Sequence, residues 1–100
     1  MSGLLLRAYG LSYQEGLFLG KPIEVAMHHK AVVLKVGFRS DGRLYLFCVE
    51  PTEGRPILQK RLFLSLMEGD LLPAGMSAIW PVQSTHVVVE YPAGFTFPAK

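Results

Sequence analysis

The residues whose types could carry chemistry gather between His28 and Glu50. Two adjacent histidines, His28 and His29, offer nitrogen ligands for a transition metal. Adjacent residues of a strand point to opposite faces, so we do not expect these two rings to share one ion. The sequence contains no HExxH, paired-cysteine or His-x-His spacing. We therefore predict no metal site and no cofactor.

The single cysteine, Cys48, is the obvious candidate nucleophile. Thiolate chemistry needs a lowered thiol pKa and a neighbouring base, whereas Cys48 lies in an apolar stretch that favours an inert, buried thiol. Glycine-rich phosphate loops of the GxGxxG and GxxxxGK types are absent from the sequence. The sequence thus predicts a protein that is not an enzyme. A pocket that gathered Arg61, His86 and Glu90 would argue the opposite.

Basic residues offer a second candidate site, provided that their strands are neighbours. They are Lys35, Arg39, Arg43, Lys60 and Arg61. With Tyr45 or Phe47 exposed beside them, such a face would resemble a sheet surface that binds single-stranded nucleic acid or a nucleotide. We prefer a solvated outer face whose cations limit edge-to-edge pairing, because the formal net charge is only +2 and the cations are not densely clustered.

Hydrophobic residues make up 50% of the chain, which is more than a single sheet needs to cover one face. The surplus belongs either to the core of the monomer or to an interface, including an interface with another copy. The candidate contact residues are Leu17, Phe18, Leu19, Trp80, Phe95 and Phe97. Across all these candidates, the residues that we predict to bind a partner are Lys35, Arg39, Arg61, Trp80 and His86.

Strands with turns between them must position these side chains. Residues 31–38 alternate, with Val32, Leu34, Val36 and Phe38 on one face, and this predicts a half-buried strand. Asp41-Gly42 predicts a hairpin turn to a second strand at 43–50. That second strand is apolar on both faces, which predicts a central or covered position.

Further strands are predicted along the rest of the chain. "VVVEY" should pair with the preceding "SAIWPV", and Pro81 places the latter at a sheet edge or at a bulge. "PIEVAM" and "GLLLRAY" are also expected to be strands. Segment 57–67 has the length of a helix, but its three consecutive polar residues form no helical stripe, so we favour a strand.

These elements predict a mainly β fold with little helix: a small antiparallel β-sandwich or partly open β-barrel. Proline or glycine recurs at intervals typical of short strands, and 100 residues suit a single domain over 1–100. The proline-rich tail, 92–100, is expected to pack through Phe95 and Phe97. One cysteine allows no internal disulfide, and no apolar run approaches a membrane span, so we expect a soluble, cytoplasmic protein without membrane contacts.

Taken together, several of these segments resemble a group of short, uncharacterised, phage-associated proteins. The matching pieces are the "PIEV" segment from Pro22 to Val36, the aromatic strand from Leu44 to Pro51, Arg61-x-Phe63, the turn from Gly69 to Pro73, and the last strand from Val87 to Glu90. The chain departs from the group where Glu68-Gly69 replaces a Thr-Gly pair. The resemblance implies a small β-domain in a phage or prophage setting and implies no chemistry.

We therefore predict a non-catalytic accessory binding protein of phage type that occupies a host protein or a small ligand. Anti-defence or host takeover would be the concrete role, in the cytoplasm of the host cell. Two alternatives are a structural subunit of the virion and a nucleic-acid-binding β module, whose affinity would fall steeply with salt. A homo-oligomer is compatible with each of these.

Overall fold

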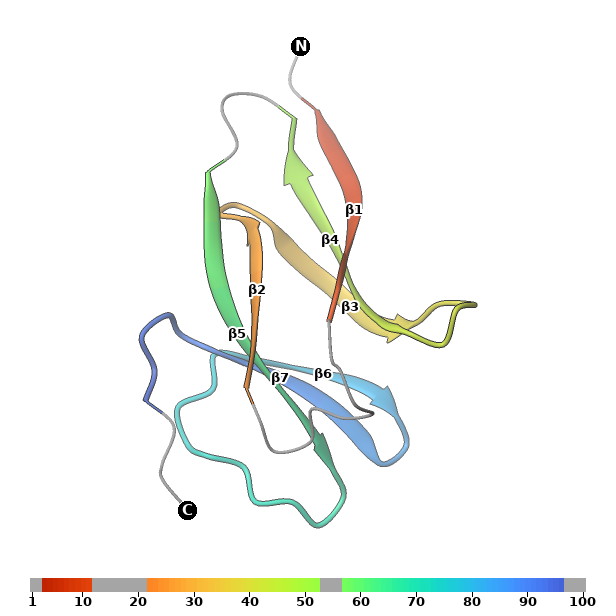
Figure 1. Ribbon diagram of the computed structural model, residues 1–100, viewed down its shortest axis with the longest axis vertical. Helices are drawn as coiled ribbons and strands as arrows, with labels where there is room; N and C mark the ends of the chain where they lie inside the picture. Colours follow the sequence, from red (N-terminus) through yellow and green to blue (C-terminus); the bar gives the residue numbers. More distant parts are fainter. Residues whose placement is uncertain (1–2, 12–21, 53–56, 97–100) are drawn as a thin grey trace.

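The computed structural model describes residues 3–11, 22–52 and 57–96, which form seven strands and no helix (Figure 1). The strands are β1 (Leu4–Gly10), β2 (Ile23–His28), β3 (Val32–Phe38), β4 (Leu44–Pro51), β5 (Leu58–Met67), β6 (Ala78–Gln83) and β7 (His86–Tyr91). The predicted mainly β class is confirmed. No helix of the described part is long and apolar enough to cross a membrane.

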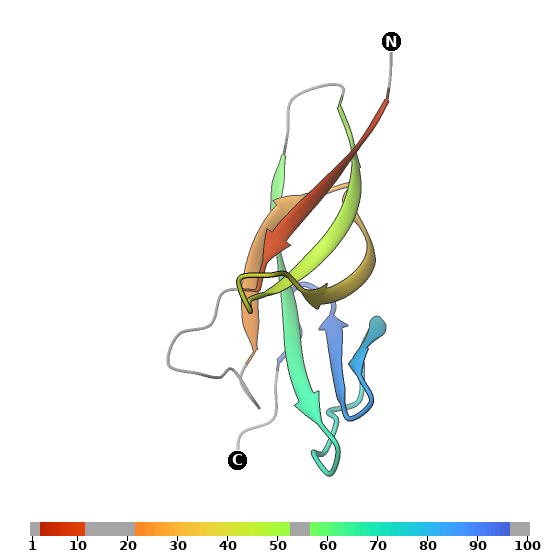
Figure 2. The same cartoon turned by 90° about the vertical axis from the view of Figure 1, so that its right-hand side faces the viewer.

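The strands form two antiparallel sheets that enclose the core. Sheet A has the order β1-β4-β3, and sheet B has the order β2-β5-β7-β6. The edges of the two sheets approach each other where β3 lies beside β6 and β1 beside β2 (Figure 2). Within the described residues no hydrogen-bonded ladder joins the sheets, so the structure is a small sandwich and not a closed barrel.

Strand β5 runs along most of the long axis of the molecule and has a different neighbour at each end (Figure 1). Residues 58–63 pair with β2, and residues 62–67 pair with β7 on the other edge. The prediction of a strand over 57–67 is confirmed. Both faces of its second half are buried, which removes the alternation that would identify a strand in the sequence.

Local turn chemistry sets the positions of the two hairpins. Gly42 adopts a positive φ of 80° after Asp41, and the Asp41 carboxylate accepts a hydrogen bond from the Arg43 amide at 2.9 Å. β4 then occupies the centre of sheet A, as predicted. β6 is an edge strand, and its register with β7 shifts between Pro81 and Gln83, so both expectations for Pro81 are confirmed.

The prediction that the even-numbered residues of β3 share one face is wrong. The register with β4 shifts between Val33 and Lys35, which marks a β-bulge at Leu34. Val33 and Val36 are buried, whereas Val32 and Leu34 are more than half exposed. The extra residue reverses the alternation part of the way along the strand, so the four even-numbered residues do not share one face.

Two clusters of apolar side chains hold the sandwich together. The larger one lies between the sheets and contains Leu11, Val25, Met27, Ala31, Val33, Val36, Leu44, Leu46, Cys48, Phe63 and Val88. The smaller one lies on the far side of sheet B and contains Leu64, Leu66, Val89 and Tyr91. Phe95 from the tail stacks on Tyr91 with ring centroids 4.4 Å apart, as expected for that part of the tail. Leu17, Phe18, Leu19 and Phe97 lie outside the described residues.

Candidate functional site

The structure distributes the five predicted binding residues over three places. Lys35 and Arg39 project from the same side of sheet A. Arg61 and His86 lie between the sheets, and Trp80 is half-buried on edge strand β6, where its ring is 6.2 Å from that of Phe63. Only Lys35 and Arg39 are therefore brought together on a surface.

Arg61 is bound by an interior ion pair. Its guanidinium donates to both carboxylate oxygens of Glu90, at 2.5 and 2.7 Å, and to the backbone carbonyl of Ala31 at 2.7 Å. The hydrogen bond to Glu90 is the main cause that raises the pKa of Arg61. This arrangement satisfies a buried cation, so Arg61 does not join Lys35 and Arg39 in one basic face.

His86 is engaged with Ser65 and not with the ion pair. The Ser65 hydroxyl and the Nε2 atom of His86 form a hydrogen bond, and both residues are buried, with Ser65 only 1% exposed. Burial lowers the pKa of His86, which favours the neutral ring. His86 and Glu90 are four residues apart on β7, a distance of about 13 Å along a strand. The pocket that would argue for an enzyme is therefore not formed by His86, Glu90 and Arg61.

A third buried polar group links sheet A to the end of β2. Glu50 accepts hydrogen bonds from the Tyr9 hydroxyl at 2.5 Å and from Nε of Arg7 at 3.1 Å. The Tyr9 oxygen in turn accepts from the backbone amide of His28 at 3.3 Å. Burial, followed by the hydrogen bond to Glu50, raises the pKa of Tyr9. Every buried side-chain nitrogen and oxygen of the described residues has a partner, so these groups serve the fold.

The two histidines do not point to opposite faces, contrary to the prediction. β2 ends at His28, and in the turn that follows the rings of His28 and His29 stack with centroids 4.9 Å apart. Nδ1 of His28 accepts the backbone amide of Lys30 at 3.0 Å. Among the residues that the structure describes, no three His, Cys, Asp or Glu side chains form a group that could hold a metal ion.

Cys48 points into the core from the inner side of β4. Its side chain is fully buried, and burial raises the pKa of the thiol to about 11. A thiol with this pKa is almost wholly protonated at neutral pH and is a poor nucleophile.

None of the described strands covers the opposite side of β4, and this side forms the candidate site. Alternate residues of β4 point outward, and they are Tyr45, Phe47, Val49 and Pro51, each half-buried. The register places Gly10 of β1 and Gly37 of β3 on either side of Tyr45, and Ala8 and Lys35 on either side of Phe47. We call the outward side chains of β1, β4 and β3, with the turn that joins β3 to β4, the outer face of sheet A.

Small residues beside the two rings keep them accessible. A Cβ atom at Gly10 would lie 3.6 Å from the Tyr45 ring, and one at Gly37 would lie 3.9 Å from the Phe47 ring. Larger side chains at these positions would pack against the rings and cover them. The Tyr45 and Phe47 centroids are 6.5 Å apart, so the two rings form a continuous aromatic strip along the central strand.

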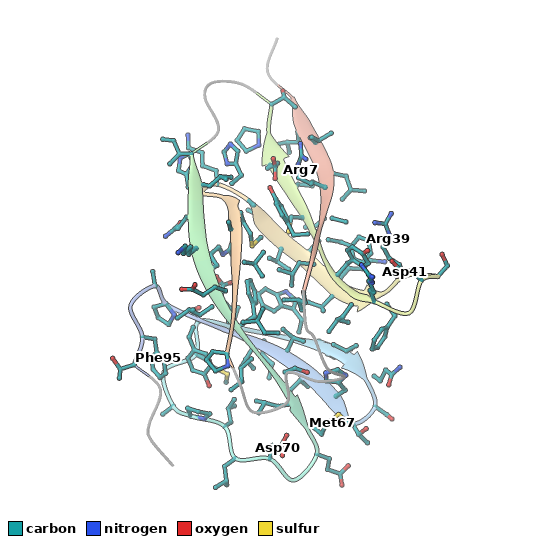
Figure 3. All side chains as sticks on the ribbon, viewed as in Figure 1. Arg7, Arg39, Asp41, Met67, Asp70 and Phe95 are labelled. Atoms are coloured by element: carbon teal, nitrogen blue, oxygen red, sulfur yellow. The ribbon has the colours of Figure 1, made fainter. Side chains whose placement is uncertain are left out.

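Cations lie above this strip. Nζ of Lys35 is 5.2 Å from the centroid of Phe47, and Cζ of Arg39 is 4.7 Å from that of Tyr45, both within the range of a cation–π contact. Asp41 accepts a hydrogen bond from the Tyr45 hydroxyl at 2.9 Å. Figure 3 shows Arg39 and Asp41 at the end of sheet A that lies away from Arg7.

The charge at this end of the face is predominantly positive. The Arg39 amide donates to the Arg43 carbonyl at 3.0 Å, so Arg43 lies across the turn from Arg39. Hydrogen bonding from the Arg43 amide is the main cause that lowers the pKa of Asp41, which stays ionised at neutral pH. Lys35 and Arg39 thus lie over the strip, and Asp41 and Arg43 belong to the adjoining turn, so this end of the face carries three cations and one anion. The other end of the face is apolar, with Leu4, Leu6 and Val32 all more than half exposed.

Sequence reasoning identified the rings and cations of this face but not the glycines beside the rings. The aromatic alternation at 45 and 47 was a usable signal, and so was Gly37 within an otherwise apolar strand. Gly10 reaches Tyr45 only because β1 pairs with β4, and no local pattern reveals that pairing. Comparison with protein-family models, curated proteins and solved structures gave no match to the chain.

Proposed function

We propose that this chain is a non-catalytic binding protein and that the outer face of sheet A is its binding surface. The observation that carries the proposal is the aromatic strip of Tyr45 and Phe47, which has glycines beside it and the flexible cations of Lys35 and Arg39 above it. A sheet face that carried no ligand would gain stability by placing larger side chains beside these rings. Arg61 and His86 are held by hydrogen bonds between the sheets, and the buried Cys48 thiol is protonated. These structural roles agree with a protein that binds and does not catalyse.

The biological setting in this proposal comes from the resemblance to phage-associated proteins. In that setting the protein is an accessory that acts in the cytoplasm of a host cell on a host protein or a small ligand. Binding of nucleic acid is the second candidate, and it is favoured by one specific observation, the presence of Lys35 and Arg39 directly above aromatic rings.

Site-specific photocrosslinking tests the surface without assuming the ligand. A benzophenone amino acid replaces Phe47 in one variant. In the control variant it replaces Lys60, an exposed residue of sheet B. After irradiation in cells, mass spectrometry identifies each adduct as protein, nucleic acid or small molecule. We expect an adduct from position 47 and none from position 60.

Three results would contradict the proposal in whole or in part. Equal adducts from both positions would mean that crosslinking reports exposure only, and an adduct from position 60 alone would place the binding surface on sheet B. Turnover of any member of a nucleotide panel by the purified protein would overturn the non-catalytic part.

A further inference from the structure

We propose that the outer face of sheet A binds single-stranded nucleic acid. Tyr45 and Phe47 provide the stacking surface for bases, and Lys35, Arg39 and Arg43 contact the phosphates. The inference rests on the proposed function for its binding surface, and it takes the second candidate ligand, nucleic acid, in place of a host protein or a small ligand.

The first feature that favours nucleic acid is the pair of rings. Tyr45 and Phe47 are two residues apart on the central strand, so both project from the same side, and their half-buried state fixes them in place. Asp41 holds the Tyr45 hydroxyl at 2.9 Å and so fixes the orientation of that ring as well. Every base has a flat π face, so two fixed rings bind bases with little dependence on sequence.

The second feature that favours nucleic acid is the pair of cations above the rings. Lys35 and Arg39 are exposed, and each lies over the ring that a base would occupy. Their side chains are long and flexible, so an incoming base displaces the cation from the ring and the cation moves to the adjacent phosphate. Lys35 and Arg39 therefore cover the rings in the free state and contact phosphates in the bound state, where each contact is a charge-assisted hydrogen bond.

The shape of the face selects single strands. A three-stranded sheet with rings at its centre presents a broad stacking surface, and the described residues include no helix that could enter a groove. Bases inside a duplex are stacked on one another and cannot reach Tyr45 or Phe47. The apolar end of the face, at Leu4, Leu6 and Val32, would suit a protein partner, and that alternative is an outcome of the test below.

The test uses fluorescence anisotropy with labelled oligodeoxyuridylate and oligouridylate of about twelve nucleotides, which differ only in the sugar, and a mixed-sequence duplex of equal length. We expect both single strands to bind and the duplex to bind at least about 10-fold more weakly. The comparison of the two single strands shows which sugar is preferred. Three phosphate contacts at roughly 0.7 each give a slope of log K against log salt near −2, so a tenfold rise in salt weakens binding about 100-fold.

Matched variants assign the effect to this face. Tyr45→Leu and Phe47→Leu keep an apolar side chain in the sheet and remove the ring, and each should weaken binding about 10- to 100-fold. Lys35→Gln and Arg39→Gln should each reduce the salt slope by roughly 0.7. Lys60→Gln removes the same charge from sheet B and should leave both affinity and slope unchanged. Circular dichroism melting confirms that each variant is folded.

The outcomes separate this inference from the proposed function. If neither oligonucleotide binds while the position-47 crosslink captures a protein or a small molecule, the nucleic-acid inference is overturned and the binding surface stands. If neither oligonucleotide binds and position 47 gives no adduct, both are overturned. Equal binding of the duplex, or an equal loss in Lys60→Gln, would also contradict stacking on this face.

Discussion

The interior ion pair between Arg61 and Glu90 gives the most quantitative prediction. The two side chains are 17% and 12% exposed, and two hydrogen bonds of 2.5 and 2.7 Å join them. Glu90→Gln replaces the carboxylate with an amide of nearly the same shape. The substitution leaves the Arg61 cation in the interior without a counter-ion.

Removing one partner of a buried pair typically costs about 3–5 kcal/mol of unfolding free energy. A domain of this size has a total stability of about 5–15 kcal/mol, so the variant should lose a large fraction of it. At about 4–8 °C per kcal/mol, the melting temperature should fall by at least roughly 12 °C. Arg61→Met combined with Glu90→Leu removes both charges and should recover most of the loss, because the desolvation cost disappears with them.

Urea denaturation followed by circular dichroism measures these free energies. Glu24→Gln is the matched control, because Glu24 pairs with Lys60 at 4.0 Å with the two side chains 58% and 74% exposed. That exposed pair should contribute less than about 1 kcal/mol. Equal destabilisation by Glu90→Gln and Glu24→Gln would contradict a buried ion pair at Arg61, and so would a double variant that is less stable than Glu90→Gln alone.

Three further predictions address other buried or strained residues. Burial lowers the pKa of His86 in the folded state, so the free energy of unfolding should be constant above about pH 6.5, the usual pKa of histidine, and should fall as the pH drops from there through the folded-state pKa. His86→Gln should remove this part of the acid sensitivity, which urea titrations at two pH values measure. Cys48, with a thiol pKa near 11, should react with a thiol reagent only at the rate of unfolding, and rapid labelling of the native protein would contradict its burial. Gly75→Ala should destabilise the protein by about 1–3 kcal/mol in thermal melts, because its φ is 104° and the new Cβ would lie 2.8 Å from the Phe95 ring. Gly94→Ala has a similar φ of 82° without that contact, so it should cost less, and an equal cost would exclude the ring contact as a cause.

Most strands could be predicted from the sequence because their signals are local. Asp41-Gly42 specifies its hairpin through backbone conformation alone, and Pro81 specifies an edge or a bulge because it lacks an amide donor. The bulge at Leu34 was missed, because it depends on the partner strand and not on the residues of β3.

The candidate site was only partly predictable for a related reason. Lys35 and Arg61 are both basic residues on strands, and the sequence gives no basis for separating them. Sheet packing turns Lys35 toward solvent and Arg61 toward Glu90, so the predicted basic face divides between the surface and the interior. The pairing of Gly10 with Tyr45 joins residues far apart in the chain, and such contacts are fixed only when the whole sheet forms.

The divided pairing of β5 also affects how the chain reaches this structure. The β3–β4 and β6–β7 hairpins close through short turns and should form within about 1–10 μs. Sheet B is complete only when one half of β5 has paired with β2 and the other half with β7. Sheet A is complete only when β1 has paired with β4. These contacts join distant parts of the chain, so we expect folding over milliseconds to seconds, limited by the pairing of β5 with β2 and the β6–β7 hairpin and by the pairing of β1 with the β3–β4 hairpin.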